Sequence, residues 1–282
     1  MNTTSLAKVE SFTLDDNYSV PGAALDALDQ DGVVCLRRAF SNAWLDVIEQ
    51  GIELALSGAS TNVDIINREN DPGSFSVSSG AWMQVESFRH FIFDSHIASI
   101  AWSLLKTRQL VLFYDFLLIK EAFSKNAATP WHQDHSYYPL DGTKAINCWI
   151  ALDDIPLESA LQFMQASHRP AKLYRAVDFD NPENDYRHAR KELPLPPTSE
   201  KDFPTAILST ALSAGDMLAW KSYTLHSAPG NQLDRRRAAF SVNWLGDDIV
   251  FNNKPSLETY RDPSQVAGQA IICNKFPLVR SE

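Results

Sequence analysis

Apolar residues recur at helical spacing in the first hundred positions of the chain and follow strand-like patterns after residue 109. Ser41 is a favourable N-cap, and Gly32 and Gly58 are placed to end helices. Residues between 61 and 80 are rich in Asn, Ser, Asp and Gly, which is typical of a loop. The elements predicted for this part are helices at 21–31, 41–58 and 95–105, a strand at 33–36 and a loop at 61–80.

The second part of the chain contains short apolar segments separated by turns. One of them alternates, so that Ile146, Cys148, Ile150 and Leu152 share a face. The predicted strands are 109–119, 145–152, 161–164, 216–220 and 235–244. The predicted helices lie in the first part of the chain and most of the strands in the second. This order favours a mainly β fold, a sandwich or jelly roll flanked by N-terminal α-helices, over alternating βαβ units.

Length and loop composition predict the domain organisation. The 282 residues suit one domain, 1–282, whose polar residues 1–20 are expected to form a loose arm. Residues 176–205 hold five prolines and many charges. We interpret that segment as a lid-like insertion, although an ordinary surface loop explains it equally well.

Charge and cysteine content narrow the classes of partner. The chain has 25 Lys and Arg against 35 Asp and Glu, a net charge of −10, which disfavours nucleic acid as a partner. Its three cysteines form no CxxC pair, and no apolar signal core or membrane-length run is present. We therefore expect a cytoplasmic protein that does not insert into a membrane, and we leave a homodimer open.

The segment PWHQDHSYYP contains the first candidate metal ligands. His132 and Asp134 are two residues apart, so in an extended segment both side chains point to the same side. His135, as the neighbour of Asp134, is expected to face away. The HxD pattern alone also occurs by chance as a surface His beside a solvated Asp.

A third ligand is expected downstream on a neighbouring strand. His226 supplies it, at the end of a strand that starts from the Gly215-Asp216 turn and stops before the Pro229-Gly230 turn. Two histidines and one carboxylate form the ligand set expected for non-haem Fe(II), with three coordination positions left for chemistry. The other histidines, at 90, 96, 168 and 188, are interpreted as ordinary surface or core residues.

An arginine follows eleven residues after His226. In the predicted strand, Arg237, Ala239, Ser241 and Asn243 share one face, which periodicity alone would assign to solvent. A guanidinium beside a metal site is suited to hold a dicarboxylate through charge-assisted hydrogen bonds of roughly 1.5–3 kcal/mol each.

These spaced motifs together resemble the phytanoyl-CoA dioxygenase-like family of Fe(II)/2-oxoglutarate oxygenases. The resemblance rests on HQDHSYYP, on LQFMQASHR, on HSAPGN followed by RRRAAFS, and on the N-terminal LDALDQDGVVCLRRAF, and it covers most of residues 22–245. Gln165-Ala166 replaces the family's Pro-Gly, and Glu158-Ser159-Ala160 stands where an Asn-Gly turn is common. The resemblance implies a double-stranded β-helix, the cupin-like jelly roll.

The resemblance also implies roles for individual residues. His132, Asp134 and His226 would be the catalytic iron ligands, with 2-oxoglutarate and O2 as co-substrates. Arg237 would anchor the distal carboxylate of 2-oxoglutarate. The other implied cofactor-binding residues are Ser241 as a helper, Lys120 near the second carboxylate, and Tyr138 as an aromatic residue of the pocket wall.

The expected function is oxidation of an unactivated C–H bond, by hydroxylation or by desaturation or rearrangement at the same site. Asp134 argues against a halogenase, in which a small residue replaces the carboxylate. The substrate is expected to be a small organic molecule such as a natural-product intermediate. Segments 61–82 and 176–205 are expected to shape the pocket that binds it. The alternatives are a cupin-like isomerase or hydrolase without 2-oxoglutarate, which has no need of Arg237, and a non-catalytic jelly-roll binding protein.

Overall fold

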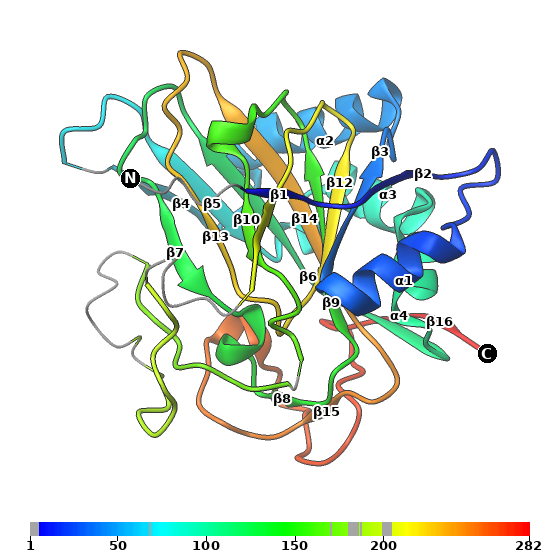
Figure 1. Cartoon of the computed structure of the whole chain (residues 1–282). Helices are drawn as coiled ribbons and strands as arrows, with labels where there is room; N and C mark the ends of the chain where they lie inside the picture. Colours follow the sequence, from blue (N-terminus) through cyan, green and yellow to red (C-terminus); the bar gives the residue numbers. More distant parts are fainter. Residues whose placement is uncertain (1–5, 68, 170, 180–185, 187, 199–204) are drawn as a thin grey trace.

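A large antiparallel sheet forms the centre of the computed structural model (Figure 1), which describes residues 6–67, 69–169, 171–179, 186, 188–198 and 205–282. The strand order is β2-β3-β12-β9-β14-β6-β5-β4, with β16 on β6, and only the β2–β3 pair is parallel. The strands are β2 (Ser11–Thr13), β3 (Val33–Arg37), β4 (Val63–Ile66), β5 (Phe75–Ser79), β6 (Gln109–Lys120), β9 (Ala145–Ala151), β12 (Met217–Lys221), β14 (Arg237–Leu245) and β16 (Leu278–Ser281).

A smaller sheet packs against part of the large one. Its order is β1-β11-β10-β13-β7, and a separate two-stranded ladder joins β8 and β15. The strands are β1 (Ala7–Lys8), β7 (Thr129–His132), β8 (Leu140–Asp141), β10 (Gln162–Met164), β11 (Ile207–Ser209), β13 (His226–Ala228) and β15 (Val250–Phe251). Phe163 and Leu208 of this sheet share an apolar cluster with Trp149 and Leu218 of the large sheet. Two facing sheets of this kind form the predicted jelly roll.

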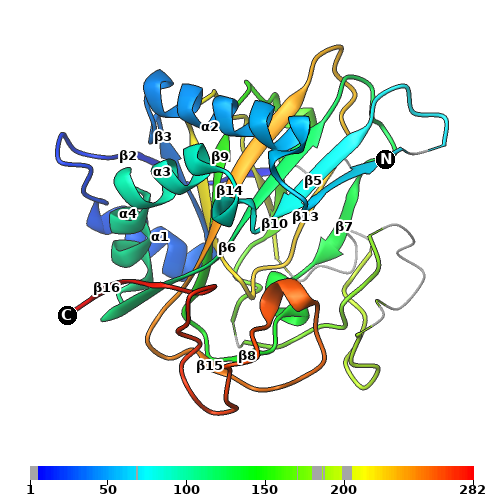
Figure 2. The same ribbon diagram turned by 180° about the vertical axis from the view of Figure 1, so that it is seen from behind.

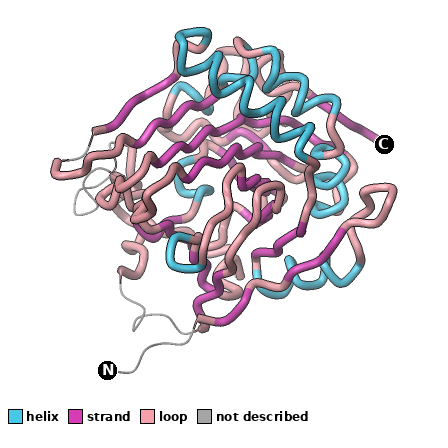
Figure 3. The backbone as a smooth tube through the Cα atoms, turned by 90° about the horizontal axis from the view of Figure 1, so that it is seen from above, coloured by secondary structure: helices cyan, strands magenta, loops and turns pink. Residues whose placement is uncertain are grey.

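Four helices cover the outer face of the large sheet (Figures 2 and 3). They are α1 (Gly22–Asp31), α2 (Asn42–Leu54), α3 (Glu86–Asp94) and α4 (Ile97–Leu105). Their buried faces join the main core, where Phe88 stacks on Phe240 of β14 with ring centroids 4.6 Å apart. No helix among the described residues is both long and apolar enough to cross a membrane.

The predicted long strands are confirmed, with ends shifted by one or two residues. Two predictions for residues 61–94 are wrong. The expected loop at 61–80 contains the hairpin β4–β5, and β5 pairs with β6 from Phe75↔Lys120 to Ser79↔Phe116. Turn-forming residues dominate the composition of residues 61–80, so the two short strands gave no clear signal in the sequence. The prediction also made no helix of residues 86–94, where α3 lies.

Within the predicted loose arm, residues 7–8 and 11–13 form paired strands. β1 pairs with β11 and β2 pairs with β3, and Val9 between them is fully buried. Such edge pairing depends on partners that lie far along the chain, so the polar composition gave no signal of it. Residues 1–5 lie outside the described residues, as do 180–185, 187 and 199–204 of the predicted lid-like insertion.

Candidate metal centre

Two neighbouring strands of the smaller sheet bring His132, Asp134 and His226 together. His132 ends β7 and lies directly opposite His226, the first residue of β13. One ligand atom from each of the three side chains lies within 4.8 Å of the others. The Nε2 atoms of His132 and His226 are 3.7 and 3.6 Å from Asp134 Oδ1. This spacing lets one divalent ion contact all three side chains.

The local backbone differs from the expected extended HxD segment. Gln133 is extended, but Asp134 is the first residue of a short 3-10 helix, η3 (Asp134–Tyr137). Similarly, the strand that starts after Gly215 does not run on to His226. β12 ends at Lys221 in the large sheet, and the chain then turns and enters the smaller sheet as β13. The change of sheet places His226 opposite His132.

Backbone carbonyls hold the two histidine rings in the form that binds a metal. His132 Nδ1 lies 2.8 Å from the carbonyl oxygen of Pro130, and His226 Nδ1 lies 3.0 Å from that of Thr224. A ring nitrogen this close to a carbonyl must carry the proton and donate it. The Nε2 lone pairs therefore face Asp134 and are available for coordination.

The carboxylate is oriented by an indole. Trp220 Nε1 donates to Asp134 Oδ2 at 2.9 Å, which leaves Oδ1 toward the histidines. Burial raises the pKa of Asp134, but the charge of His226, the hydrogen bond and charge of His132 and the hydrogen bond of Trp220 outweigh it, so the pKa is lowered overall. Burial and the neighbouring His132 lower the pKa of His226 to about 4. Asp134 and His226 thus favour the deprotonated forms that a metal requires.

His135 points away from this centre, as expected. Its Nδ1 lies 3.0 Å from the Ser222 hydroxyl, its Nε2 lies 3.2 Å from the Leu140 carbonyl, and its ring stacks on Tyr223. Burial lowers the pKa of His135 to about 4. The ring is therefore a neutral part of the core.

Arg237 and Lys120 lie side by side on β14 and β6, where they are register partners. Arg237 is 5% exposed, and its guanidinium donates to the carbonyls of Ser159 and Pro229. Burial alone lowers its pKa to about 10, and no carboxylate of the described residues pairs with it. Its neighbour Arg236, on the other face, pairs with Glu49 at 2.6 Å. A buried cation without a carboxylate is a favourable site for an anion.

Lys120 is 1% exposed and also points inward. Its Nζ donates to the Pro229 carbonyl at 3.0 Å and lies 5.3 Å from the ring centre of Phe75 on β5. Pro229 therefore receives hydrogen bonds from both cations. Lys120 is therefore not a solvated residue at the end of its strand, because Phe75 of the β4–β5 hairpin lies against it.

Ser241 and Tyr138 line the same cavity but bond mainly to other side chains. The Ser241 hydroxyl donates to Asn147 Oδ1 at 2.5 Å. The Tyr138 hydroxyl lies 2.7 Å from that of Tyr114 and 3.4 Å from Asn243 Oδ1. Burial raises the pKa of Tyr138 well above its ordinary value, so it remains a neutral phenol.

These groups share one cavity of about 610 Å³ between the sheets. Its wall includes the β4–β5 hairpin and Val177, Asp178, Phe179 and Tyr186 from the segment predicted to be a lid. Sequence reasoning missed the hairpin, Asn147, Tyr114, Tyr260 and the carboxylate-orienting Trp220. No local pattern could have indicated Trp220, because its strand β12 belongs to the other sheet and comes close to Asp134 only after folding.

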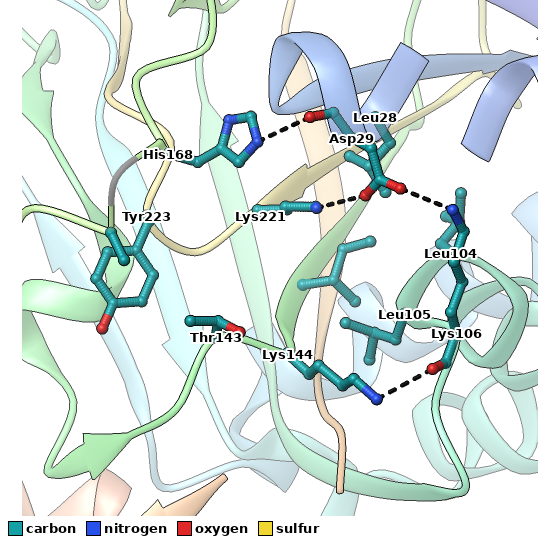
Figure 4. A pocket seen from close by; sticks show the side chains of 12 residues that line it. Leu28, Asp29, Leu104, Leu105, Lys106, Thr143, Lys144, His168, Lys221 and Tyr223 are labelled. Atoms are coloured by element: carbon teal, nitrogen blue, oxygen red, sulfur yellow. Dashed lines mark hydrogen bonds and ion pairs between the residues drawn. The ribbon is translucent and has the colours of Figure 1, made fainter. Parts of the chain in front are cut away.

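A second cavity, of about 280 Å³, lies between α1, α4 and the start of β9 (Figure 4). Its polar groups bond to one another. Asp29 accepts from Lys106 at 2.7 Å and from Lys221 at 2.6 Å, and Lys144 reaches Asp247 at 2.6 Å. His168 Nε2 contacts only the backbone carbonyl of Asp29 there. Ion pairs thus take up the charges of this cavity.

Comparison with known proteins assigns the family. The phytanoyl-CoA dioxygenase family model matches residues 28–239, so the chain belongs to that family. A curated phytanoyl-CoA dioxygenase from Arabidopsis thaliana is 26% identical over 162 residues, 57% of this chain and 53% of that protein. The chain therefore aligns with about half the length of that relative.

Solved structures share the fold. The non-haem α-ketoglutarate-dependent carbocyclase SnoK from nogalamycin biosynthesis superposes with a TM-score of 0.71 at 21% identity, over 92% of this chain and 96% of SnoK. The epimerase SnoN of the same pathway gives 0.70 at 21% identity, over 93% and 98%. EctD from S. alaskensis gives 0.65 at 15% identity, over 98% and 91%. The predicted family and the jelly-roll fold are both confirmed.

Proposed function

We propose that this chain is a non-haem Fe(II)/2-oxoglutarate-dependent dioxygenase that oxidises a C–H bond of a small organic molecule. The observation that carries the proposal is the convergence of two Nε2 lone pairs on the Asp134 carboxylate, beside a buried arginine that has no carboxylate partner among the described residues. Membership of the phytanoyl-CoA dioxygenase family supports it.

The donor set fits ferrous iron. Two imidazoles and one carboxylate occupy one side of an ion and leave the other side for co-substrate and oxygen. When bound, iron with 2-oxoglutarate would supply the oxidation of the substrate, coupled to decarboxylation of the co-substrate. In this proposal His132, Asp134 and His226 hold the ion, and Trp220 fixes the direction of the carboxylate.

The remaining roles follow from charge and burial. Arg237 would bind one carboxylate of 2-oxoglutarate, and Lys120, its register partner, would neutralise the second charge. Ser241 and Tyr138 would shape the wall rather than bind the co-substrate, because their hydroxyls are engaged with Asn147 and Tyr114. The hairpin β4–β5 and residues 177–179 would exclude water from the centre.

The reaction is proposed to be hydroxylation, or a desaturation or rearrangement at the same site. SnoK and SnoN act in nogalamycin biosynthesis, which supports a natural-product intermediate as the substrate here. A cytoplasmic location, a single domain over 1–282 and a homodimer remain predictions.

The test is the visible charge-transfer band that Fe(II) gives with bound 2-oxoglutarate. Purified protein is loaded anaerobically with Fe(II), and 2-oxoglutarate is then added. We expect a band in the parent that is lost in His226→Ala and in Arg237→Ala, the latter at concentrations that saturate the parent. A folded parent that binds iron without giving a band would refute the use of 2-oxoglutarate and favour the cupin-like metalloenzyme. A parent that binds no metal would favour a non-catalytic binding protein.

A further inference from the structure

Asn147 is a polar side chain of the larger cavity to which the proposed function gives no role. It lies on β9, lines the cavity and is 6% exposed. The Ser241 hydroxyl donates to its Oδ1 at 2.5 Å, which fixes the end of the amide that accepts. Among the described residues no group accepts a hydrogen bond from the other end, Nδ2. A buried amide donor on a cavity wall is suited to an oxygen acceptor on a ligand.

Strand register places Asn147 on one side of the candidate metal centre. Its register partner on β12 is Trp220, whose indole donates to Asp134 Oδ2 at 2.9 Å. Register partners of an antiparallel pair point to the same face, with Cβ atoms about 4.5–5.5 Å apart. Asn147 therefore adjoins the residue that orients the metal-binding carboxylate. A ligand atom bound by Asn147 lies on the Trp220 side of the centre.

The same register separates Asn147 from the anchor of the co-substrate. On β14 its register partner is Asn243, and Arg237 lies at the other end of that strand. The residues between these two positions span roughly 20 Å of extended chain. The carbon chain of 2-oxoglutarate is only about as long as two extended residues. If the proposed function holds, on which this inference rests, 2-oxoglutarate on Arg237 leaves the Asn147 amide to the substrate.

Aromatic rings surround the Asn147 end of the cavity. Tyr114 on β6 is paired in register with Asn243, the partner of Asn147. The ring of Tyr260 lies 5.2 Å from that of Tyr114 and 5.1 Å from that of Tyr138, and all three tyrosines line the cavity. Their ring faces favour contact with a planar, largely apolar group.

We propose that Asn147 is a specificity-determining residue whose amide N–H binds a carbonyl or hydroxyl oxygen of a planar, largely apolar substrate. This hydrogen bond fixes the orientation of the substrate against the tyrosine wall. It thereby selects the C–H bond that faces the metal centre. Arg237 binds the co-substrate in this arrangement, and Asn147 contacts only the substrate.

The test uses a matched pair of probes, 2-acetylnaphthalene and 2-isopropylnaphthalene, which have the same shape and differ by a carbonyl oxygen. Binding of each is measured by anaerobic equilibrium dialysis against protein loaded with Fe(II) and excess 2-oxoglutarate. We expect the parent to bind the ketone about 3- to 10-fold more tightly, because the hydrocarbon leaves the amide N–H without an acceptor.

Variants locate the group that recognises the oxygen. Asn147→Leu is expected to remove the preference for the ketone and to leave 2-oxoglutarate affinity unchanged. Because this change strands the Ser241 hydroxyl, Asn147→Leu combined with Ser241→Ala removes both ends of their hydrogen bond and should give the same loss of preference. Asn243→Leu is the matched control, since Asn243 is the register partner of Asn147 but does not line the cavity. It should keep the preference.

The outcomes separate this inference from the proposed function. In a sample that shows the charge-transfer band, a parent without preference for the ketone overturns the inference. So does a preference that survives both Asn147 variants or that Asn243→Leu removes equally. A loss of 2-oxoglutarate affinity in Asn147→Leu as large as in Arg237→Ala would assign Asn147 to the co-substrate and also overturn it. Absence of the band in the parent overturns the proposed function instead.

Discussion

The two cavities of this protein contain similar residue types, but the side chains have different partners in each. Each has a histidine whose pKa burial lowers to about 4, namely His226 in the larger cavity and His168 in the smaller. Beside His226, Asp134 directs one oxygen at two imidazole lone pairs. Beside His168, the carboxylate of Asp29 is taken by two lysines. A candidate metal site therefore depends on unengaged, convergent donors and not on residue type.

The cations of the two cavities differ in the same way. Lys106, Lys144 and Lys221 each pair with Asp29 or Asp247, so each of these cations of the smaller cavity has a carboxylate partner. In the larger cavity Arg237 is buried among carbonyls, with no carboxylate partner among the described residues. An arrangement that carries an uncompensated buried charge is stable only if a ligand completes it.

The largest expected effect concerns iron. Replacing His132 by Ala removes one of three donors, and we expect Fe(II) affinity to fall by at least about 100-fold, more than the loss of a supporting group costs. The matched variant His168→Ala removes a histidine of the smaller cavity and should leave the affinity unchanged. Anaerobic titration with Fe(II) measures both. Equal losses in the two variants would erase the distinction between the cavities.

The next effect concerns the co-substrate. Lys120→Met removes a buried ammonium beside Arg237, and we expect 2-oxoglutarate affinity to fall about tenfold, the worth of one charge-assisted hydrogen bond. Lys221→Met removes the same charge from the smaller cavity and serves as the control. Both are measured by titrating 2-oxoglutarate into the Fe(II)-loaded protein. If the control weakened binding as much, the effect would be one of overall charge.

A pH effect is expected at the smaller cavity. Burial and the nearby charge of Lys221 lower the pKa of His168 in the folded protein from the ordinary histidine value of 6.5 to about 4. Between these values the unfolded state binds more protons, so stability falls as pH falls from 6.5 to 4. His168→Gln should make this fall shallower, which denaturant unfolding at several pH values would detect. A pH dependence as steep as the parent's would show that other groups carry it.

The smallest effect is expected from the ion pairs themselves. Asp29→Asn breaks the contacts to Lys106 and Lys221, but the Asp29 side chain is 43% exposed. Pairs this open to solvent contribute about 0–1 kcal/mol to the free energy of unfolding. We expect a loss within that range and unchanged 2-oxoglutarate binding. A much larger loss, seen in denaturant unfolding, would mean that the smaller cavity organises the fold.

The sequence predicted those parts of the site that short-range patterns encode. The HxD spacing indicated His132 and Asp134, and strand alternation placed Arg237, Ser241 and Asn243 on one face. The conformation of Asp134 was not predictable in this way. Its place at the start of a 3-10 helix depends on contacts such as the Trp220 indole, which arrives from another strand.

The sequence by itself determined the long strands, three of the four helices, the donor types and the family, because periodicity and spaced motifs are local properties of the chain. Only the tertiary structure decided what those residues do for one another. The chain turns between β12 and β13, which places His226 opposite His132. The β4–β5 hairpin, whose composition had predicted a loop, covers Lys120. The tertiary structure also left Arg237 without a carboxylate of the described chain while pairing the lysines of the smaller cavity. Burial and pairing depend on segments far apart in sequence, so no local pattern specifies them.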